Sequence, residues 1–264
     1  MEKYNLTHEF RGNTVCIAQE PRERTDKNSD NTGWTCWEAS NVILRFVAHD
    51  DDVVALLGKR KCWNDIHFLD LSAGAGLIAI ACAAAGAQHV VACDIPDQVP
   101  QLLRNVVRND VAVDVLPYWW GTPIQTIKPP WHSSDVRTEC WYDLVFCSDI
   151  LYIALRDKRT DELEATVREI AVRAAVIVFS FEERLPQEEQ QFMLKLGLDD
   201  AMAPLDVLEV KGAAVEVTQE TALQGAGGHA DTDLFNPALF WEPPPIRLFL
   251  LRVRDRRIVT DLTC

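Results

Sequence analysis

The stretch 67–97, HFLDLSAGAGLIAIACAAAGAQHVVACDIPD, decides the fold of this chain. Its first part, 68–71, is a short apolar run that stops at the five small residues 72–76. Such residues let a backbone turn sharply and approach a ligand closely. The order therefore predicts a strand that leads into a glycine-rich turn.

After the turn, residues 77–85 favour a helix that Gly86 ends, and the apolar run 90–93 predicts a second strand ending at Asp94. Strand, turn, helix and strand form a βαβ unit of a parallel sheet. Asp94 follows Gly74 by 20 residues, the separation at which an acidic side chain can accept both hydroxyls of a ribose. The stretch predicts a bound nucleoside.

The glycine pattern does not identify that nucleoside. Gly74-x-Gly76-x-x-Ala79 also satisfies the fingerprint of proteins that bind nicotinamide dinucleotides. A tight connection between a strand and a helix favours glycine even where no ligand binds. These residues alone leave all three interpretations open.

Length and charge limit the number of domains and the classes of partner that the chain can have. The 264 residues, 48% of them hydrophobic, suffice for one large domain with a substantial core. We expect that domain at 33–264, after an N-terminal extension, 1–32, with a possible edge strand at 13–19. The net charge of −14 argues against a nucleic-acid partner and suits a protein partner with a basic segment. We also expect a monomer.

The eight cysteines form no Cys-x-x-Cys pair, and no histidine has the spacing of a metal ligand, so we expect no metal site. Several cysteines lie inside apolar runs, where a free thiol behaves as a small hydrophobic group. That usage is typical of a reducing compartment. Because we find no signal peptide and no run of 18 apolar residues, we expect no membrane partner and a cytoplasmic or nuclear location.

Hydrophobic periodicity and turn residues predict the remaining elements. Further strands are expected at 111–116, 141–149, 174–181 and 246–254, and one or two more strands are expected within 205–217. Helices are expected at 33–47, 53–57, 98–109, 156–173 and 186–196, and loops at 20–31, 122–140 and 218–245.

Aromatic and acidic residues cluster where these strands end. Trp119 and Trp120 follow the third strand, at the carboxyl edge where open α/β sheets bind ligands, and an indole ring suits an adenine base. Asp149 ends the next strand, with Tyr152 three residues later. Trp37, at the mouth of the first helix, could shield the ligand or serve as a core residue.

With these elements in order, the chain resembles the seven-β-strand, Rossmann-like methyltransferases, and within them the methyltransferase 16 family of protein-lysine methyltransferases. The matching elements are Trp37-Glu38-Ala39-Ser40, the run from Asp70 to Leu77, Asp94-Ile95-Pro96, Asn105, Asn109, Trp120-Gly121, Asp149-x-x-Tyr152 and Glu183-Arg184. The resemblance implies an α/β fold with a seven-stranded, mostly parallel sheet and helices on both faces, with the methyltransferase domain at 33–264.

The resemblance also implies S-adenosylmethionine as the cofactor. The residues that would line it are Trp37, Asp70, Ser72, Ala73, Gly74, Gly76, Asp94, Ile95, Trp120 and Ser148. Asp149 and Tyr152 would act as catalytic residues between the methyl group and an incoming lysine of a protein substrate. The chain departs from the family at Ser72, where glycine is usual, and this change predicts weaker cofactor binding or an impaired protein.

Methyl transfer from a sulfonium to an amine is an in-line displacement, which needs alignment and the exclusion of water more than covalent machinery. A carboxylate, aromatic rings and glycines suit that task, and Asp149 could orient the lysine and offset the positive charge. Two alternatives stay open at this stage. One is an NAD-dependent oxidoreductase, and the other is a binding protein that kept the fold but lost turnover.

Overall fold

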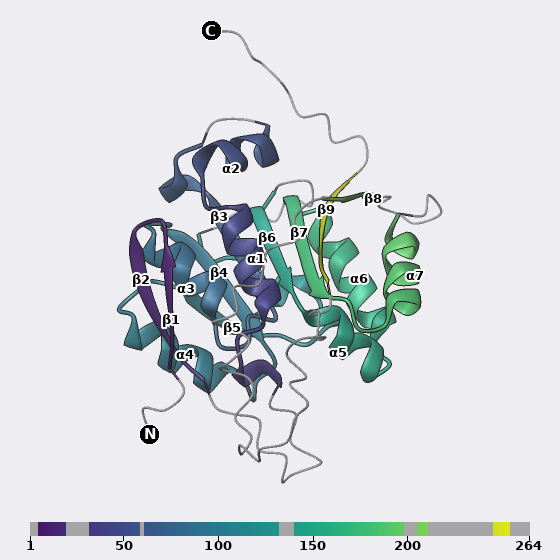
Figure 1. The fold of residues 1–264 in the computed structure, drawn as a ribbon, viewed down its shortest axis with the longest axis horizontal. Coiled ribbons are helices and arrows are strands. Elements are labelled where there is room, and N and C mark those ends of the chain that lie inside the picture. The colour runs from purple at the N-terminus through teal and green to yellow at the C-terminus, as the bar shows by residue number, and fades with distance from the viewer. Residues whose placement is uncertain are drawn as a thin grey trace, which may run out of the picture.

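The computed structural model describes residues 5–19, 32–58, 61–131, 140–197, 205–210 and 245–253. The loop predicted at 20–31, residues 132–139 of the loop at 122–140 and almost all of the loop at 218–245 lie outside these residues. The main element is a seven-stranded sheet with the strand order β5-β4-β3-β6-β7-β9-β8 (Figure 1).

The first five strands of that order run parallel. They are β5 (Asp114–Pro117), β4 (His89–Asp94), β3 (His67–Leu71), β6 (Tyr142–Ser148) and β7 (Ala174–Glu182). The four inner ones are buried almost throughout, as expected for strands covered on both faces. The predicted βαβ unit is confirmed as β3, α3 and β4.

The opposite edge of the sheet is antiparallel. Strand β9 (Ile246–Val253) lies between β7 and β8 (Leu205–Glu209) and runs antiparallel to both. The predicted α/β fold with a mostly parallel seven-stranded sheet is therefore confirmed.

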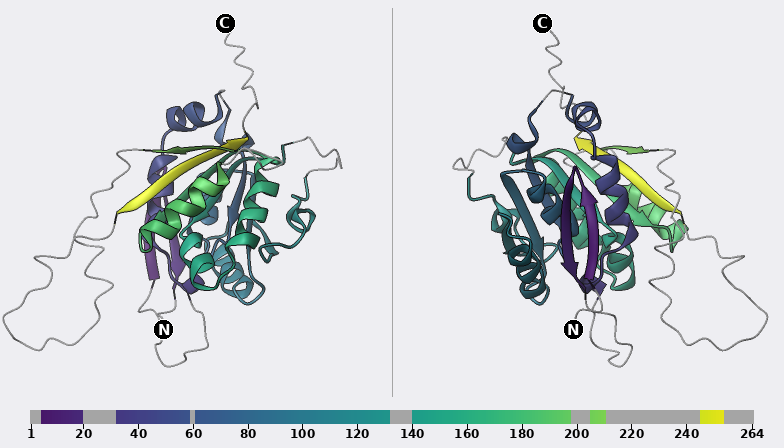
Figure 2. Two further views of the ribbon diagram at one scale, coloured as in Figure 1. Left: turned by 90° about the vertical axis from the view of Figure 1, so that its right-hand side faces the viewer. Right: turned by 60° about the vertical axis from the view of Figure 1, so that its left-hand side comes forward.

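Helices cover both faces of the sheet, so that two apolar clusters form (Figure 2). One cluster contains residues of α1 (Glu38–Phe46), α2 (Asp50–Leu57), α3 (Leu77–Ala84) and α4 (Val99–Arg108). The other contains residues of α5 (Ile150–Arg156), α6 (Thr160–Ala171) and α7 (Pro186–Leu196). Short 3-10 turns occur at η1 (Thr32–Trp34), η2 (Trp63–Asp65) and η3 (Ile124–Ile127).

Several boundaries differ from the sequence-based prediction. The helix expected at 33–47 begins only at Glu38, after the 3-10 turn η1, and the helix expected at 53–57 begins at Asp50. The helix expected at 156–173 is α6, which begins at Thr160 rather than at 156, and α5, which ends at Arg156, was not predicted. Between them Lys158 has a φ of 56°, a left-handed conformation that interrupts a helix. The third strand begins at Asp114 rather than at 111.

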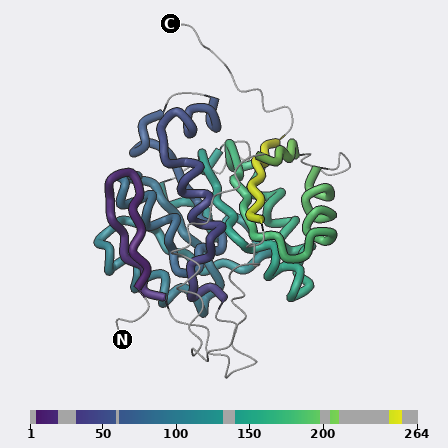
Figure 3. The backbone as a smooth tube through the Cα atoms, viewed as in Figure 1, coloured from purple at the N-terminus to yellow at the C-terminus, as the bar shows by residue number. Residues whose placement is uncertain are grey.

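The predicted edge strand at 13–19 exists, but not at the edge of the main sheet. Strand β2 (Asn13–Ala18) pairs with β1 (Asn5–Phe10), which was not predicted, in a separate two-stranded sheet (Figure 3). The turn residues Arg11 and Gly12 both have positive φ, 50° and 78°, as a tight two-residue hairpin turn requires. Val15 and Ile17 are fully buried, so the hairpin is part of the core.

Two asparagines of α4 bind the backbone of β2. Asn109 accepts a hydrogen bond from Cys16 N at 2.8 Å and donates to Cys16 O at 2.9 Å. Asn105 does the same with Ala18, accepting at 2.9 Å and donating at 3.1 Å. Asn105 Nδ2 also lies 2.8 Å from Ala75 O, in the glycine-rich turn. The hairpin is thus joined to the helix that follows Asp94.

Candidate active site

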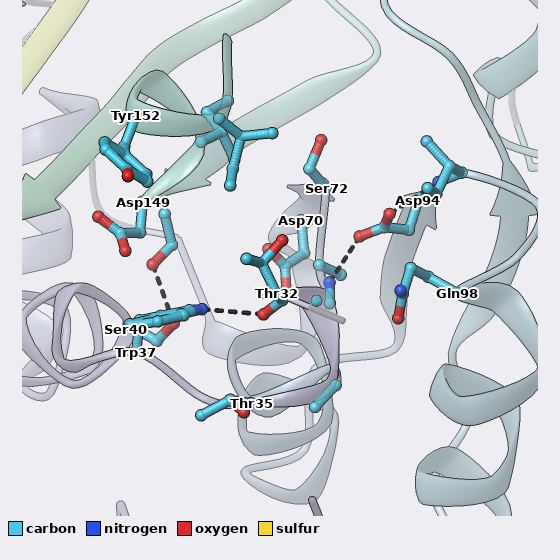
Figure 4. Close-up of a pocket in the computed structure, with 18 of the residues that line it drawn as sticks. Thr32, Thr35, Trp37, Ser40, Asp70, Ser72, Asp94, Gln98, Asp149 and Tyr152 are labelled. Carbon is cyan, nitrogen blue, oxygen red and sulfur yellow. Dashed lines mark hydrogen bonds between the residues drawn. The ribbon is translucent and has the colours of Figure 1, made fainter. Parts of the chain in front are cut away.

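A cavity of about 540 Å³ lies at the carboxyl ends of β3, β4 and β6, where open α/β sheets bind ligands. Asp94 and Gln98 lie at one end, Asp149 and Tyr152 at the other, and Asp70 and Ser72 between them (Figure 4). Eleven of the twelve predicted site residues line it, namely Trp37, Asp70, Ser72, Ala73, Gly74, Asp94, Ile95, Trp120, Ser148, Asp149 and Tyr152.

Gly76 is the predicted site residue that does not line the cavity. It precedes α3 with a φ of 90°, and a Cβ atom at this position would lie 2.4 Å from Leu102 Cδ1. The glycine therefore leaves room for Leu102 of α4, and its positive φ also suits glycine.

The turn after β3 is sharp because its residues have unusual backbone conformations. Ser72 and Gly74 both have positive φ, 60° and 55°. A Cβ atom on Gly74 would lie 2.9 Å from Gly33 O. Ala73 N donates to Cys93 O at 2.9 Å, which ties the turn to β4. The backbone around Gly74 can thus lie close to both the cavity and a covering segment.

Asp94 is built into the same turn. Its Oδ2 accepts a hydrogen bond from Gly74 N at 2.7 Å, and its Oδ1 accepts one from Ile95 N at 2.7 Å. Burial raises the pKa of Asp94 to about 6, against the opposing effect of these backbone donors. Each carboxylate oxygen keeps a further lone pair, so Asp94 can still accept two hydroxyl groups.

Two more acceptors in the cavity have no partner within the described chain. Asp70 Oδ1 and Gln98 Oε1 are buried without a hydrogen bond. Burial raises the pKa of Asp70 to about 7. Gln98 was not predicted from the sequence, although its place four residues after Asp94, at the start of α4, is a signal that could have found it. Buried unpaired acceptors are expected where a ligand supplies the donors.

Residues 32–36 are here called the covering segment; all of them except Trp34 line the cavity, and this role was also missed. Trp37 Nε1 donates to Thr32 O at 3.0 Å, and Gln101 Nε2 donates to Trp34 O at 3.2 Å. Thr32 lies in front of Asp70 in Figure 4. The segment lies over the turn, and the predicted shielding role of Trp37 is consistent with its place at the end of this segment.

The two tryptophans after β5 differ in their surroundings. Trp120 Nε1 lies 3.0 Å from Ser72 Oγ and donates to it. Trp119 is 42% exposed. The guanidinium of Arg159 lies 5.4 Å from the Trp119 ring and 5.9 Å from the Trp120 ring, and it donates to Trp120 O at 3.1 Å. Trp120 is therefore held from both sides at the wall of the cavity.

Asp149 lies at the opposite end and is paired with an arginine. Arg184 Nη1 and Nη2 lie 2.7 Å and 2.9 Å from the two oxygens of Asp149. The guanidinium carbon lies 5.3 Å from the Trp37 ring and 5.0 Å from the Tyr152 ring. The sequence suggested that the charge of Asp149 offsets that of the cofactor and the lysine, but in this structure Arg184 already neutralises it.

The sequence profile of a family described as lysine methyltransferase matches residues 20–198, more than half of the chain. The chain belongs to this lysine methyltransferase family. The membership confirms the predicted resemblance and implies S-adenosylmethionine as the methyl donor. It favours this cofactor over the nicotinamide alternative.

Solved structures similar to this family member are distant. The bifunctional kinase-methyltransferase WbdD has a TM-score of 0.48 and 15% identity, over 89% of this chain and 43% of that chain. A putative RNA methyltransferase from Pyrococcus horikoshii has a TM-score of 0.42 and 13% identity, over 82% of this chain and 83% of that chain. The METTL16 methyltransferase domain has a TM-score of 0.44 and 12% identity, over 81% of this chain and 69% of that chain. A search among curated proteins found no match.

The side chains of this lysine methyltransferase family member fit the cofactor. Asp94 could accept the ribose hydroxyls, and Asp70 and Gln98 each offer one unpaired acceptor oxygen to donor groups of the cofactor. Among the described residues, no group of three or more potential ligands could hold a metal ion. In the same part of the chain, no helix has the length and apolar character needed to cross a bilayer.

Proposed function

We propose that this protein transfers a methyl group from S-adenosylmethionine to the side chain of a lysine in a protein substrate. The observation that carries the proposal is that one cavity joins the nucleoside-type acceptors Asp94 and Gln98 to Asp149 and Tyr152, in a member of a lysine methyltransferase family. A single cavity of this kind can hold donor and acceptor at the same time.

The bound cofactor supplies a methyl group on a positively charged sulfur. Asp94 fixes the ribose, and the carboxyl of Asp70 binds a cationic group once it is deprotonated. Ser72 to Gly74 let the backbone approach closely, while Trp120 forms a wall. These contacts fix the position of the methyl group, since an in-line displacement depends on alignment.

At the other end, Trp37 and Tyr152 form aromatic walls around Asp149. Aromatic faces attract an alkyl ammonium through the electron density of the ring. Once an amine has lost its proton, the same walls favour its neutral form by excluding water. The net charge of −14 suits a substrate with a basic segment around the lysine.

Two experiments test the proposal. The purified protein is incubated with a cell lysate and S-adenosylmethionine carrying a tritiated methyl group, and the labelled bands are analysed by mass spectrometry. We expect methyl-lysine in a labelled protein. Label found only on RNA or a small molecule would reject the lysine assignment and leave the cofactor assignment intact.

Calorimetric titration tests the cofactor separately. The protein should bind S-adenosylmethionine and not NAD. Asp94→Ala should abolish measurable binding, since a carboxylate accepting two ribose hydroxyls contributes roughly 2–4 kcal/mol. Asp97→Ala is the matched control, because Asp97 is exposed and lies outside the cavity. Equal affinity in the two variants would contradict the role of Asp94.

A further inference from the structure

Three side chains enclose a cation at the acceptor end of the cavity. Asp149 lies at the base, and the rings of Trp37 and Tyr152 lie within 5.3 Å and 5.0 Å of the Arg184 guanidinium carbon. We call these three residues the acceptor cage. Aromatic rings around a carboxylate form the type of site that recognises organic cations. In this structure the cage holds a cation of the chain itself.

The bound guanidinium uses both oxygens of Asp149 in two parallel hydrogen bonds, at 2.7 Å and 2.9 Å. Such paired bonds between arginine and a carboxylate are stronger than neutral hydrogen bonds. Glu182 also pairs with Arg184, from the end of β7. A lysine ammonium that approached Asp149 would therefore meet a site already filled.

Arg184 can leave this place without disrupting a helix or strand. It lies in the connection between β7 and α7, and its side chain is 20% exposed, whereas that of Asp149 is 5% exposed. Its backbone N–H donates to Glu189 Oε1 at 3.1 Å, a bond that does not involve the guanidinium. Rotation of the side chain alone can thus empty the cage.

We propose that the acceptor cage is the binding site for the cationic side chain of the substrate. The guanidinium of Arg184 competes with that side chain for the cage, so it must move out of the cage before a lysine binds. This inference rests on the proposed function and adds a gate to it.

A different role for Arg184 predicts the opposite effect. If the arginine only holds Asp149 in position, its removal should leave the site misaligned and reduce turnover. If it competes with the substrate, its removal should open the site and strengthen acceptor binding. The sign of the change on removing Arg184 therefore decides between the two.

The first measurement does not depend on methylation. Binding of n-butylammonium and of methylguanidinium is measured by calorimetry for the wild type, Arg184→Ala and Arg247→Ala, each saturated with S-adenosylhomocysteine. Arg247 is the matched control, because its side chain is also 20% exposed, pairs with two carboxylates and lies 5.0 Å from an aromatic ring, but it does not line the cavity.

We expect Arg184→Ala to bind both cations at least about tenfold more tightly than the wild type or Arg247→Ala. The double variant Arg184→Ala, Asp149→Asn should lose this gain. Arg184→Met, which keeps an apolar stem, replaces the alanine variant if that variant does not fold. Cation binding that is unchanged on removing Arg184 would overturn the proposal.

The second measurement uses an acceptor peptide containing the lysine identified by labelling. Arg184→Ala should lower KM for the peptide, and methylguanidinium should inhibit this variant in competition with the peptide while having little effect on the wild type. If the variant instead loses turnover and methylguanidinium restores it, Arg184 is a positioning residue and the gate is rejected. If no lysine is ever labelled, the proposed function fails, and cation binding still tests the cage.

Discussion

Trp120 donates its indole N–H to the hydroxyl of Ser72 at 3.0 Å. Ser72 has a φ of 60°, a conformation that suits glycine and strains other residues. The hydroxyl thus gives a compensating bond at a position with a strained backbone. The serine fixes the orientation of a tryptophan that lines the cavity.

This arrangement predicts different effects for two substitutions of Ser72. Ser72→Gly relieves about 1–2 kcal/mol of backbone strain and loses a hydrogen bond of about 1 kcal/mol, so its stability should stay close to that of the wild type. Ser72→Ala keeps the strain and loses the bond, so it should be less stable by about 1 kcal/mol. Urea unfolding measures both values.

Cofactor affinity is the second measurement on these variants. We expect Ser72→Gly to bind S-adenosylmethionine as tightly as the wild type or more tightly, because the backbone can then approach the ligand freely. A large loss of affinity, shared by the alanine variant, would instead show that the hydroxyl contacts the cofactor directly.

The buried carboxyls predict a pH dependence of cofactor binding. Burial raises the pKa of Asp70 from 3.8 to about 7 and that of Asp94 to about 6. A cationic cofactor binds the ionised form of Asp70, so affinity should be greatest above pH 7 and should fall by up to about tenfold per pH unit below it. Calorimetry from pH 8 to pH 5.5 measures the affinity for the cofactor. In Asp70→Asn the affinity should no longer fall as the pH is lowered just below 7.

Stability of the free protein should change in the opposite direction. Between pH 3.8 and about 7, Asp70 holds its proton in the folded chain but not in the unfolded one. The folded state then binds more protons, so the contribution of Asp70 to the free energy of unfolding decreases as pH rises through this window. Urea unfolding of the wild type and of Asp70→Asn should show a difference that depends on pH, and parallel curves would contradict it.

Asp149 is expected to serve turnover more than cofactor binding. Asp149→Asn keeps the shape of the side chain but removes the charge that pairs with Arg184. Misalignment of the acceptor should lower the rate by roughly 10²-fold, about 2.7 kcal/mol of barrier. Affinity for S-adenosylmethionine should change much less. Near-normal methylation of an identified substrate by this variant would falsify the catalytic role.

Two glycines at the ends of α3 offer a matched test of packing. Gly76 and Gly86 have similar positive φ angles, 90° and 96°, but an added Cβ meets Leu102 Cδ1 at 2.4 Å only in the first case and nothing within 4 Å in the second. Gly86→Ala should cost about 1–2 kcal/mol for backbone strain. Gly76→Ala should cost about 1–3 kcal/mol more because of overpacking. Equal stabilities in urea would show that α4 shifts without cost.

Sequence patterns predicted those elements whose boundaries carry local signals. Helix α7 has the predicted bounds, since Pro186 begins it, Glu188 lies in its first turn and Gly197 follows it. Helix α5 was missed because its apolar residues continue the buried pattern of β6 without a break. Strand β1 was missed because only Phe10 among its residues is buried, so its pairing with β2 rather than its own pattern holds it in place.

The site residues also divide into those with a local sequence signal and those placed by long-range packing. Asp70, Asp94 and Asp149 were predictable because each lies at or near the end of a parallel strand, and such ends meet at one edge of the sheet. Gln98 could have been found in the same way, since it follows Asp94 by four residues at the start of α4. The covering segment and the pairing of Arg184 with Asp149 depend instead on how distant segments pack together. A single sequence contains no periodic signal for such contacts.

The amides of Asn105 and Asn109 have a consequence for assembly. They bind the outer edge of β2 through four hydrogen bonds, so a strand from another molecule could pair there only by displacing them. Side chains thereby protect an edge that would otherwise invite aggregation. A shortened protein lacking the hairpin would leave these amides unpaired and uncover the apolar surface that buries Val15 and Ile17. Any expression of the catalytic domain alone should therefore begin before Asn5.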